Sequence, residues 1–211
     1  MSKVQSVFFE GPAGRLEGIL KYRGGGESGK LAVVCHPHPL YQGTMHNKVV
    51  FAIGTALFEA GCRVLRFNFR GVGLSAGVHD EGRGEIMDTL TAVRFLKERY
   101  PSQPCLIAGF SFGAWMALEA ALQDSTLMSV VAVSPPLQNF HAALAQLTVP
   151  KLFLQGTDDR ICLPDVLQGL FPSFADPKEL VLLEQAAHFF EGHLNKLKAE
   201  IMARRKFLRI L

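Results

Sequence analysis

The sequence lacks a long apolar run: no stretch approaches the ~20 consecutive apolar residues that a membrane-spanning helix requires. Its first residues, MSKVQSVFFEG, contain no apolar core of the kind found in signal peptides. Charge of one sign is also scarce, since 22 basic and 19 acidic residues leave a formal net charge of +3. We therefore expect a cytoplasmic protein that binds neither a membrane nor nucleic acid.

Cysteine is scarce as well. The four cysteines lie far apart in the chain, at Cys35, Cys62, Cys105 and Cys162. No C-x-x-C pair occurs, which argues against a zinc site built on thiolates. Three histidines gather at His36, His38 and His46, but two of them flank prolines in an expected extended loop. We predict reduced, structural thiols and no metal site.

The chain does contain a regular alternation of short apolar strands and amphipathic helices. Strands are predicted at residues 4–9, 16–22, 31–35, 64–69, 105–108, 130–133, 151–155 and 180–183. Helices are predicted at 45–60, 85–100, 114–122, 163–170 and 194–211, the second with Ile86, Leu90, Val93 and Leu96 facing inward. This alternation indicates one α/β domain over residues 1–211, with helices on both faces of a mostly parallel sheet.

The rest of the chain is organised around residues 105–122, CLIAGFSFGAWMALEAAL. An apolar strand passes into an Ala-rich helix through G-x-S-x-G, which runs from Gly109 to Gly113 with Ser111 at its centre. A strand that turns into a helix within one residue strains that residue, and glycines two positions before and after it relieve the crowding. We predict that Ser111 is a nucleophile exposed at a helix N-terminus.

A nucleophilic serine needs a neighbouring base, and the base needs a carboxylate to orient it. Sites in parallel α/β sheets lie at the carboxyl ends of the strands. There the chain offers Asp158 and Asp159 after strand 151–155, and His188 or His193 after strand 180–183. The residues alone do not separate the two carboxylates. His188 is the predicted base, because His193 would project about 140° away if that segment were helical.

The chain resembles an α/β-hydrolase over almost its whole length. More narrowly, it is similar to small, lidless bacterial hydrolases of the dienelactone hydrolase and esterase type. These carry HPHP, R-G-x-G-x-S, G-F-S-F-G-A and A-x-H-F-F, which are found here at 36–39, 70–75, 109–114 and 186–190. The resemblance implies an α/β-hydrolase fold with about eight strands, the second of them antiparallel, and no lid domain. Its G-x-x-D pattern assigns the acid to Asp159.

An oxyanion hole needs two backbone N–H donors. One is predicted at Phe112, directly after the nucleophile, and the other in the loop that follows strand 31–35. The prolines of that loop have no N–H, which leaves His38 and Leu40, and the resemblance selects His38. We expect His36 to be a buried residue that braces the loop and not a base.

The glycines Gly71 and Gly73 suggest a dinucleotide-binding loop. The third glycine falls at Gly77, away from the expected place, and no helix opens there. We therefore expect no nucleotide and no other cofactor.

These features predict a serine hydrolase that cleaves small carboxylic esters or thioesters through an acyl-enzyme. The alternative is an acyltransferase or a non-catalytic binding relative on the same fold. The residues predicted to contact substrate are Phe110, Leu40, Tyr41 and Phe189, with Phe112, Phe140 and Phe190 as further candidates for an apolar slot. Residues 134–150 leave no room for a lid. The expected partner is a small-molecule ester, and the sequence leaves a homodimer open.

Overall fold

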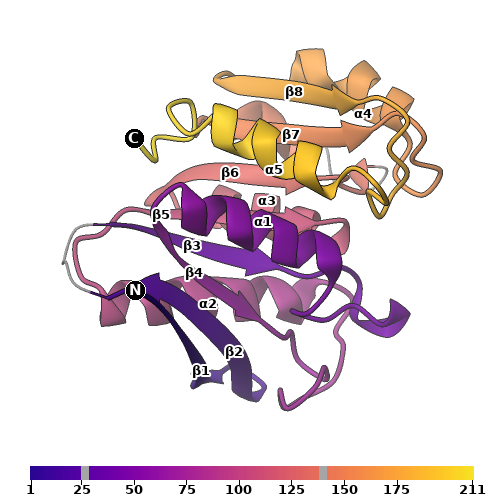
Figure 1. Cartoon of the computed structure of the whole chain (residues 1–211). Helices are drawn as coiled ribbons and strands as arrows, with labels where there is room; N and C mark the ends of the chain where they lie inside the picture. Colours follow the sequence, from indigo (N-terminus) through magenta and orange to yellow (C-terminus); the bar gives the residue numbers. More distant parts are fainter. Residues whose placement is uncertain (25–28, 138–141) are drawn as a thin grey trace.

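The computed structural model describes residues 1–24, 29–137 and 142–211. Its centre is a sheet of eight strands (Figure 1). The strands are β1 (Ser2–Gly11), β2 (Gly14–Arg23), β3 (Lys30–Cys35), β4 (Cys62–Phe67), β5 (Cys105–Phe110), β6 (Leu127–Val133), β7 (Lys151–Gly156) and β8 (Lys178–Leu183). Each predicted strand is present, within a few residues of its predicted bounds.

The strands follow the order β1-β2-β4-β3-β5-β6-β7-β8 across the sheet. β2 runs antiparallel to both of its neighbours, and every pair from β4 to β8 is parallel. Parallel neighbours require crossover connections, which the helices supply. The carboxyl ends of β3, β5, β7 and β8 therefore meet along one edge, at the right of Figure 1. The predicted fold class is confirmed.

Helices cover both faces of the sheet. On one face lie α1 (Lys48–Glu59) and α5 (Leu194–Ala203), and on the other α2 (Arg83–Arg99), α3 (Phe112–Gln123) and α4 (Pro164–Leu170) (Figure 1). The 3-10 helices are η1 (Pro39–Tyr41), η3 (Ala142–Gln146) and η4 (Phe171–Ser173). Strands β5, β6 and β7 are buried along their whole length, because helices shield them on both sides.

The inward face of α2 is more polar than predicted. Two of the four predicted apolar positions are buried, but Ile86 and Leu90 are only partly so. Glu85 and Asp88 are fully buried instead. Asp88 accepts two hydrogen bonds from the Arg70 guanidinium, at 2.9 and 2.8 Å, which compensate its desolvation. Apolar periodicity misplaces the face of this helix because paired charges share it.

The closing helix is shorter than predicted. It ends at Ala203, and residues 204–209 form turns. Leu208 and Ile210 are both buried in the core. Two residues that are two positions apart would point about 200° from each other on a continuing helix. Ending the helix early lets both side chains reach the same core.

The connection between β6 and β7 is too short to hold a lid domain. It spans residues 134–150, and its described part includes η3. Phe140, one of the candidates for an apolar slot, lies outside the described residues. Among the helices of the described ranges, none combines the length and the apolar character needed to cross a bilayer.

Candidate active site

Ser111 is the single residue between β5 and α3. Its backbone has φ 54° and ψ −123°, a conformation that residues other than glycine rarely adopt. Its N–H donates to the Val133 carbonyl at 2.9 Å, and its own carbonyl accepts from the Ala114 N–H at 2.8 Å. These bonds hold the strained residue in place, so its side chain is presented at the N-terminus of α3.

The two glycines of the turn avoid backbone collisions. A Cβ atom at Gly109 would lie 2.0 Å from the carbonyl oxygen of Gly113, which is the predicted crowding between the two positions. A Cβ atom at Gly113 would lie 2.4 Å from the carbonyl oxygen of Cys35 and 2.5 Å from that of His36. The second glycine therefore also lets α3 approach the end of β3, a contact that the motif did not predict.

Replacing Gly113 with alanine should destabilise the protein by about 1–3 kcal/mol or prevent folding, because the atoms it meets are backbone and cannot rotate away. Urea denaturation measures the effect. Gly169→Ala is the matched control, since that glycine lies within α4 and a Cβ there meets nothing within 4 Å. The control should be neutral or stabilising by up to about 1 kcal/mol. Equal midpoints for the two variants would contradict the steric argument.

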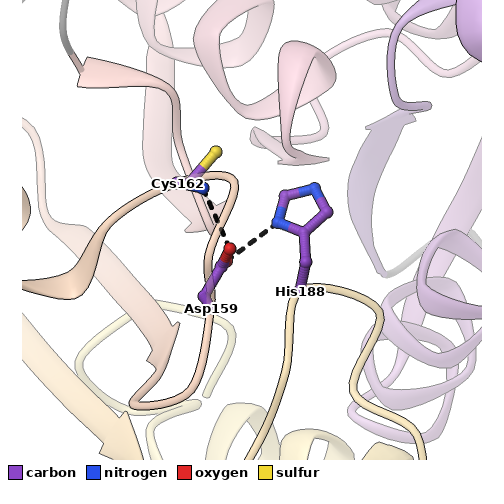
Figure 2. A group of neighbouring side chains, drawn as sticks. All are labelled: Asp159, Cys162 and His188. Carbon is purple, nitrogen blue, oxygen red and sulfur yellow. Dashed lines mark hydrogen bonds and ion pairs between the residues drawn. The ribbon is translucent and has the colours of Figure 1, made fainter.

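Three loops at the carboxyl edge bring Ser111, Asp159 and His188 together. A hydrogen bond joins His188 to Asp159 (Figure 2), with Nδ1 2.8 Å from Oδ2. On the other side of the ring, His188 Nε2 lies 3.1 Å from Ser111 Oγ. His188 is 6% exposed and Asp159 is 2% exposed. An Nδ1–H that donates to the carboxylate leaves Nε2 unprotonated, and Nε2 can then accept the serine proton.

The two adjacent carboxylates have different surroundings. Asp159 Oδ1 accepts from the N–H groups of Ile161 and Cys162, both at 2.9 Å, and its Oδ2 accepts from Gln155 Nε2 at 3.0 Å and from His188. Burial acts to raise the pKa of Asp159, but the hydrogen bonds from His188, Cys162 and Ile161 and the His188 charge outweigh it, and the pKa is lowered. Asp158 is exposed. Burial and hydrogen bonding thus distinguish Asp159 from Asp158, which residue type alone could not do.

His193 lies away from the nucleophile. Its Nδ1 atom is 2.8 Å from the Glu191 carbonyl oxygen, and the residue stands just before α5. Residues 188–193 form turns and not the helix assumed in the sequence argument. The different directions of His188 and His193 therefore do not come from helical geometry: Phe190, which lies between them, has a left-handed backbone with φ 53°.

Cys162 completes a buried group with Asp159 and His188, whose ligand atoms lie within 4.8 Å of one another (Figure 2). Such a group could in principle hold a metal ion. Here both Asp159 oxygens and His188 Nδ1 are already engaged in hydrogen bonds. Burial raises the pKa of the Cys162 thiol to about 12, so the thiol is protonated. The contacts fit a hydrogen-bonded group better than a metal centre.

The loop after β3 offers a second N–H beside that of Phe112. Phe112 is the first residue of α3, where helix geometry leaves the N–H without an acceptor. Leu40 N–H donates to His38 Nδ1 at 3.2 Å and is therefore occupied. The His38 N–H has no acceptor within the part of the chain that the structure describes. Of the two predicted alternatives, His38 is the one left free to bind an oxyanion.

His36 braces the same loop from below. It is fully buried, its Nδ1–H donates to the Pro37 carbonyl at 2.6 Å, and its Nε2 accepts from the Phe69 N–H at 3.0 Å. Burial lowers the pKa of His36 to about 3, so the ring stays neutral. Both nitrogens are used in holding the loop, in agreement with the predicted bracing role.

A cavity of about 310 Å³ opens at Ser111. Its lining residues are Pro37, His38, Tyr41, Gln42, Asn47, Ser111, Ile161, His188 and Phe189. Tyr41 and Phe189, which were predicted to contact substrate, lie in its wall. This volume is at the small end of the range for ligand pockets, about 300–1,000 Å³.

The other predicted substrate contacts fall elsewhere. Phe110 is fully buried beneath His188, with ring centroids 4.9 Å apart, and supports that ring from below the cavity. Leu40 is 68% exposed and lies outside the lining. Phe112 and Phe190 are buried and also outside it. The three buried rings pack into the core and do not line the cavity, and Leu40 projects from η1 outside the lining. Contact of these residues with substrate stays a prediction.

The R-G-x-G-x-S loop is structural. Arg70 pairs with buried Asp88 at 2.8 Å. Ser75 Oγ donates to the Asn68 carbonyl at 2.7 Å and accepts from the Glu17 N–H at 3.0 Å. These contacts tie the loop to α2 and β2, which leaves Ser75 buried and away from the cavity.

Several residues of the site were not predicted from the sequence. Gln155 binds the acid, and Ile161, Gln42 and Asn47 line the cavity. A signal existed only for Gln155, a polar residue that follows the apolar run 152–154 near the carboxyl end of its strand. The others belong to loops whose shape depends on distant parts of the chain.

Comparisons with known proteins agree with this geometry. A family model described as serine aminopeptidase S33 matches residues 42–143. An α/β serine hydrolase homologue from Coxiella burnetii is 34% identical, covers 95% of this chain and 96% of its own, and superposes with a TM-score of 0.90. A serine hydrolase without a lid from Xanthomonas campestris is 30% identical, with coverages of 97% and 94% and a TM-score of 0.88.

An uncharacterized protein of Rickettsia prowazekii is 37% identical in an alignment of length 194 that covers 87% of this chain and 81% of that protein. Est1E from Butyrivibrio proteoclasticus and an esterase from Pyrococcus furiosus share the fold at 14–20% identity. Since solved relatives of at least 30% identity align over nearly their whole length, this chain belongs to the α/β serine hydrolases, among the members that lack a lid.

Proposed function

We propose that this hydrolase cleaves small carboxylic esters or thioesters through an acyl-enzyme, with Ser111 as nucleophile, His188 as base and Asp159 as its orienting carboxylate. The observation that carries the proposal is the continuous chain of hydrogen bonds from Asp159 through His188 to Ser111. It ends at a cavity into which the serine opens. This is the arrangement that activates a serine hydroxyl near neutral pH.

In the first step, Ser111 Oγ attacks the carbonyl carbon while His188 Nε2 takes the hydroxyl proton. The carbonyl oxygen becomes an oxyanion and accepts hydrogen bonds from the N–H groups of Phe112 and His38. The positive end of α3 further favours that charge. Asp159, whose lowered pKa keeps it ionised, stabilises the imidazolium that forms.

In the second step, His188 passes its proton to the leaving group, which is the oxygen of an alcohol or the sulfur of a thiol. The acyl group stays on Ser111. Water then enters the cavity and gives a proton to His188 while its oxygen attacks the acyl carbon. Collapse of the second tetrahedral intermediate releases the acid and returns the proton to Ser111. No other group of the chain has to change its charge.

A fluorophosphonate probe tests the proposal directly, because it phosphonylates only an activated serine. The wild-type protein should be labelled once, at Ser111, and a short-chain p-nitrophenyl ester should compete with labelling. Peptide mapping identifies the modified residue. Absence of both labelling and ester turnover in folded protein would refute the proposal.

The acyl group should be short. The cavity of about 310 Å³ is open to solvent on a chain without a lid, so a long acyl chain would remain exposed. Each CH₂ left in water forgoes about 0.8 kcal/mol of burial. We expect acetyl to butyryl esters of p-nitrophenol to react faster than octanoyl or longer ones, with no interfacial activation. A kcat/KM that climbs steadily to the dodecanoyl ester would contradict this.

A further inference from the structure

The proposed function has a spatial consequence for the alcohol half of the substrate. His188 Nε2 must hand its proton to the leaving oxygen, so that oxygen has to lie within hydrogen-bond reach of His188. The alcohol carbons that follow this oxygen then extend along the cavity wall beside His188. Residues flanking His188 therefore decide which alcohols fit.

Two apolar side chains form that wall. Phe189 follows His188 in the chain, and their ring centroids lie 5.1 Å apart. Ile161 follows the acid Asp159 by two positions and is anchored to it by its N–H. Both side chains line the cavity, yet Phe189 is 40% exposed and Ile161 is 58% exposed. Each has apolar surface that an occupant of the cavity would remove from water.

The backbone of Ile161 and the ring of Phe189 are each held by a contact with a buried residue of the site. The Ile161 N–H bond to Asp159 fixes its backbone, and the Phe189 ring packs edge-on against buried Phe110 at 5.9 Å. A preorganised apolar wall contributes to binding without a large ordering penalty. The residues that line the cavity include no lysine, arginine, aspartate or glutamate.

We propose that Phe189 and Ile161 form a leaving-group subsite for apolar alcohols about the size of benzyl alcohol, which extends the proposed function to the substrate's alcohol half. The acyl half stays small, as argued above. An arylmethyl or cycloalkylmethyl alcohol supplies the same apolar contact, and the aromatic form adds an edge-to-face contact with Phe189.

Acetate esters test the subsite with the acyl group held constant. Benzyl, cyclohexylmethyl, ethyl and 2-methoxyethyl acetate have leaving alcohols of similar acidity, so their intrinsic reactivities are close. We expect kcat/KM for benzyl acetate to exceed that for ethyl acetate by about 10- to 100-fold. The 2-methoxyethyl ester should resemble the ethyl ester. The cyclohexylmethyl ester distinguishes an aromatic from an aliphatic preference.

Phe189→Ala and Ile161→Ala should each lower the benzyl-to-ethyl ratio several-fold. The ratio is the proper readout because both esters use the same His188, so any disturbance of the base cancels. Phe51→Ala is the matched control: this phenylalanine is 54% exposed on α1 and outside the cavity lining, and its variant should keep the wild-type ratio.

A wild-type ratio of kcat/KM for benzyl and ethyl acetate near one would overturn the proposed subsite. An unchanged ratio in both Phe189→Ala and Ile161→Ala would also overturn it. Fluorophosphonate labelling of Ser111 separates this result from failure of the proposed function. Labelled protein without the alcohol preference refutes the subsite alone. Unlabelled, folded protein refutes both.

Discussion

Replacing Ser111 with alanine should reduce ester hydrolysis by about four to six orders of magnitude, because Ser111 carries the one hydroxyl that contacts His188 Nε2 among the residues that the structure describes. Fluorophosphonate labelling should disappear with it. The fold should be retained, since the backbone bonds of residue 111 to Val133 and Ala114 do not involve its side chain. Stopped assays with p-nitrophenyl acetate and circular dichroism measure the two effects.

Ser125→Ala is the control for this loss. That serine is exposed between α3 and β6, and its variant should keep wild-type turnover and labelling. Undiminished hydrolysis in Ser111→Ala would show that the nucleophile lies elsewhere, as would a probe adduct mapped to Ser75.

Replacing Asp159 with asparagine should lower kcat by about 10⁴-fold. The backbone N–H groups of Ile161 and Cys162 hold one oxygen of the side chain, and asparagine can keep that oxygen in place. Its NH₂ group then faces His188 Nδ1, which must become an acceptor. The His188 proton moves to Nε2, and the ring can no longer take the proton of Ser111.

Asp158→Asn is the matched control one position away. Asp158 is exposed, and its carboxylate accepts a 3.4 Å hydrogen bond from the Thr157 hydroxyl. We expect its kcat to stay within about threefold of wild type, as for surface substitutions away from a site. A larger loss in Asp158→Asn than in Asp159→Asn would mean that the loop after β7 presents the other carboxylate in solution.

The strand and helix order follows from the sequence alone. The buried strand β5 is a continuous apolar run, and helices such as α1 carry apolar residues at helical spacing. The G-x-S-x-G turn is equally local, because a strained residue between a strand and a helix requires small neighbours whatever surrounds it. Because sites in such sheets lie at the carboxyl ends of the strands, the candidate site residues are restricted to a few loops.

The direction in which each side chain of the site points depends on tertiary structure. Asp158 and Asp159 are chemically identical, and only the path of the loop after β7 turns Asp159 toward His188 and leaves Asp158 in solvent. Phe110 and Phe189 are likewise the same residue type, yet one is packed beneath His188 and the other lines the cavity. Composition and periodicity describe what a residue can do. Its direction in a loop is set by hydrogen bonds and packing with segments far away in the chain, and these exist only once the sheet has formed.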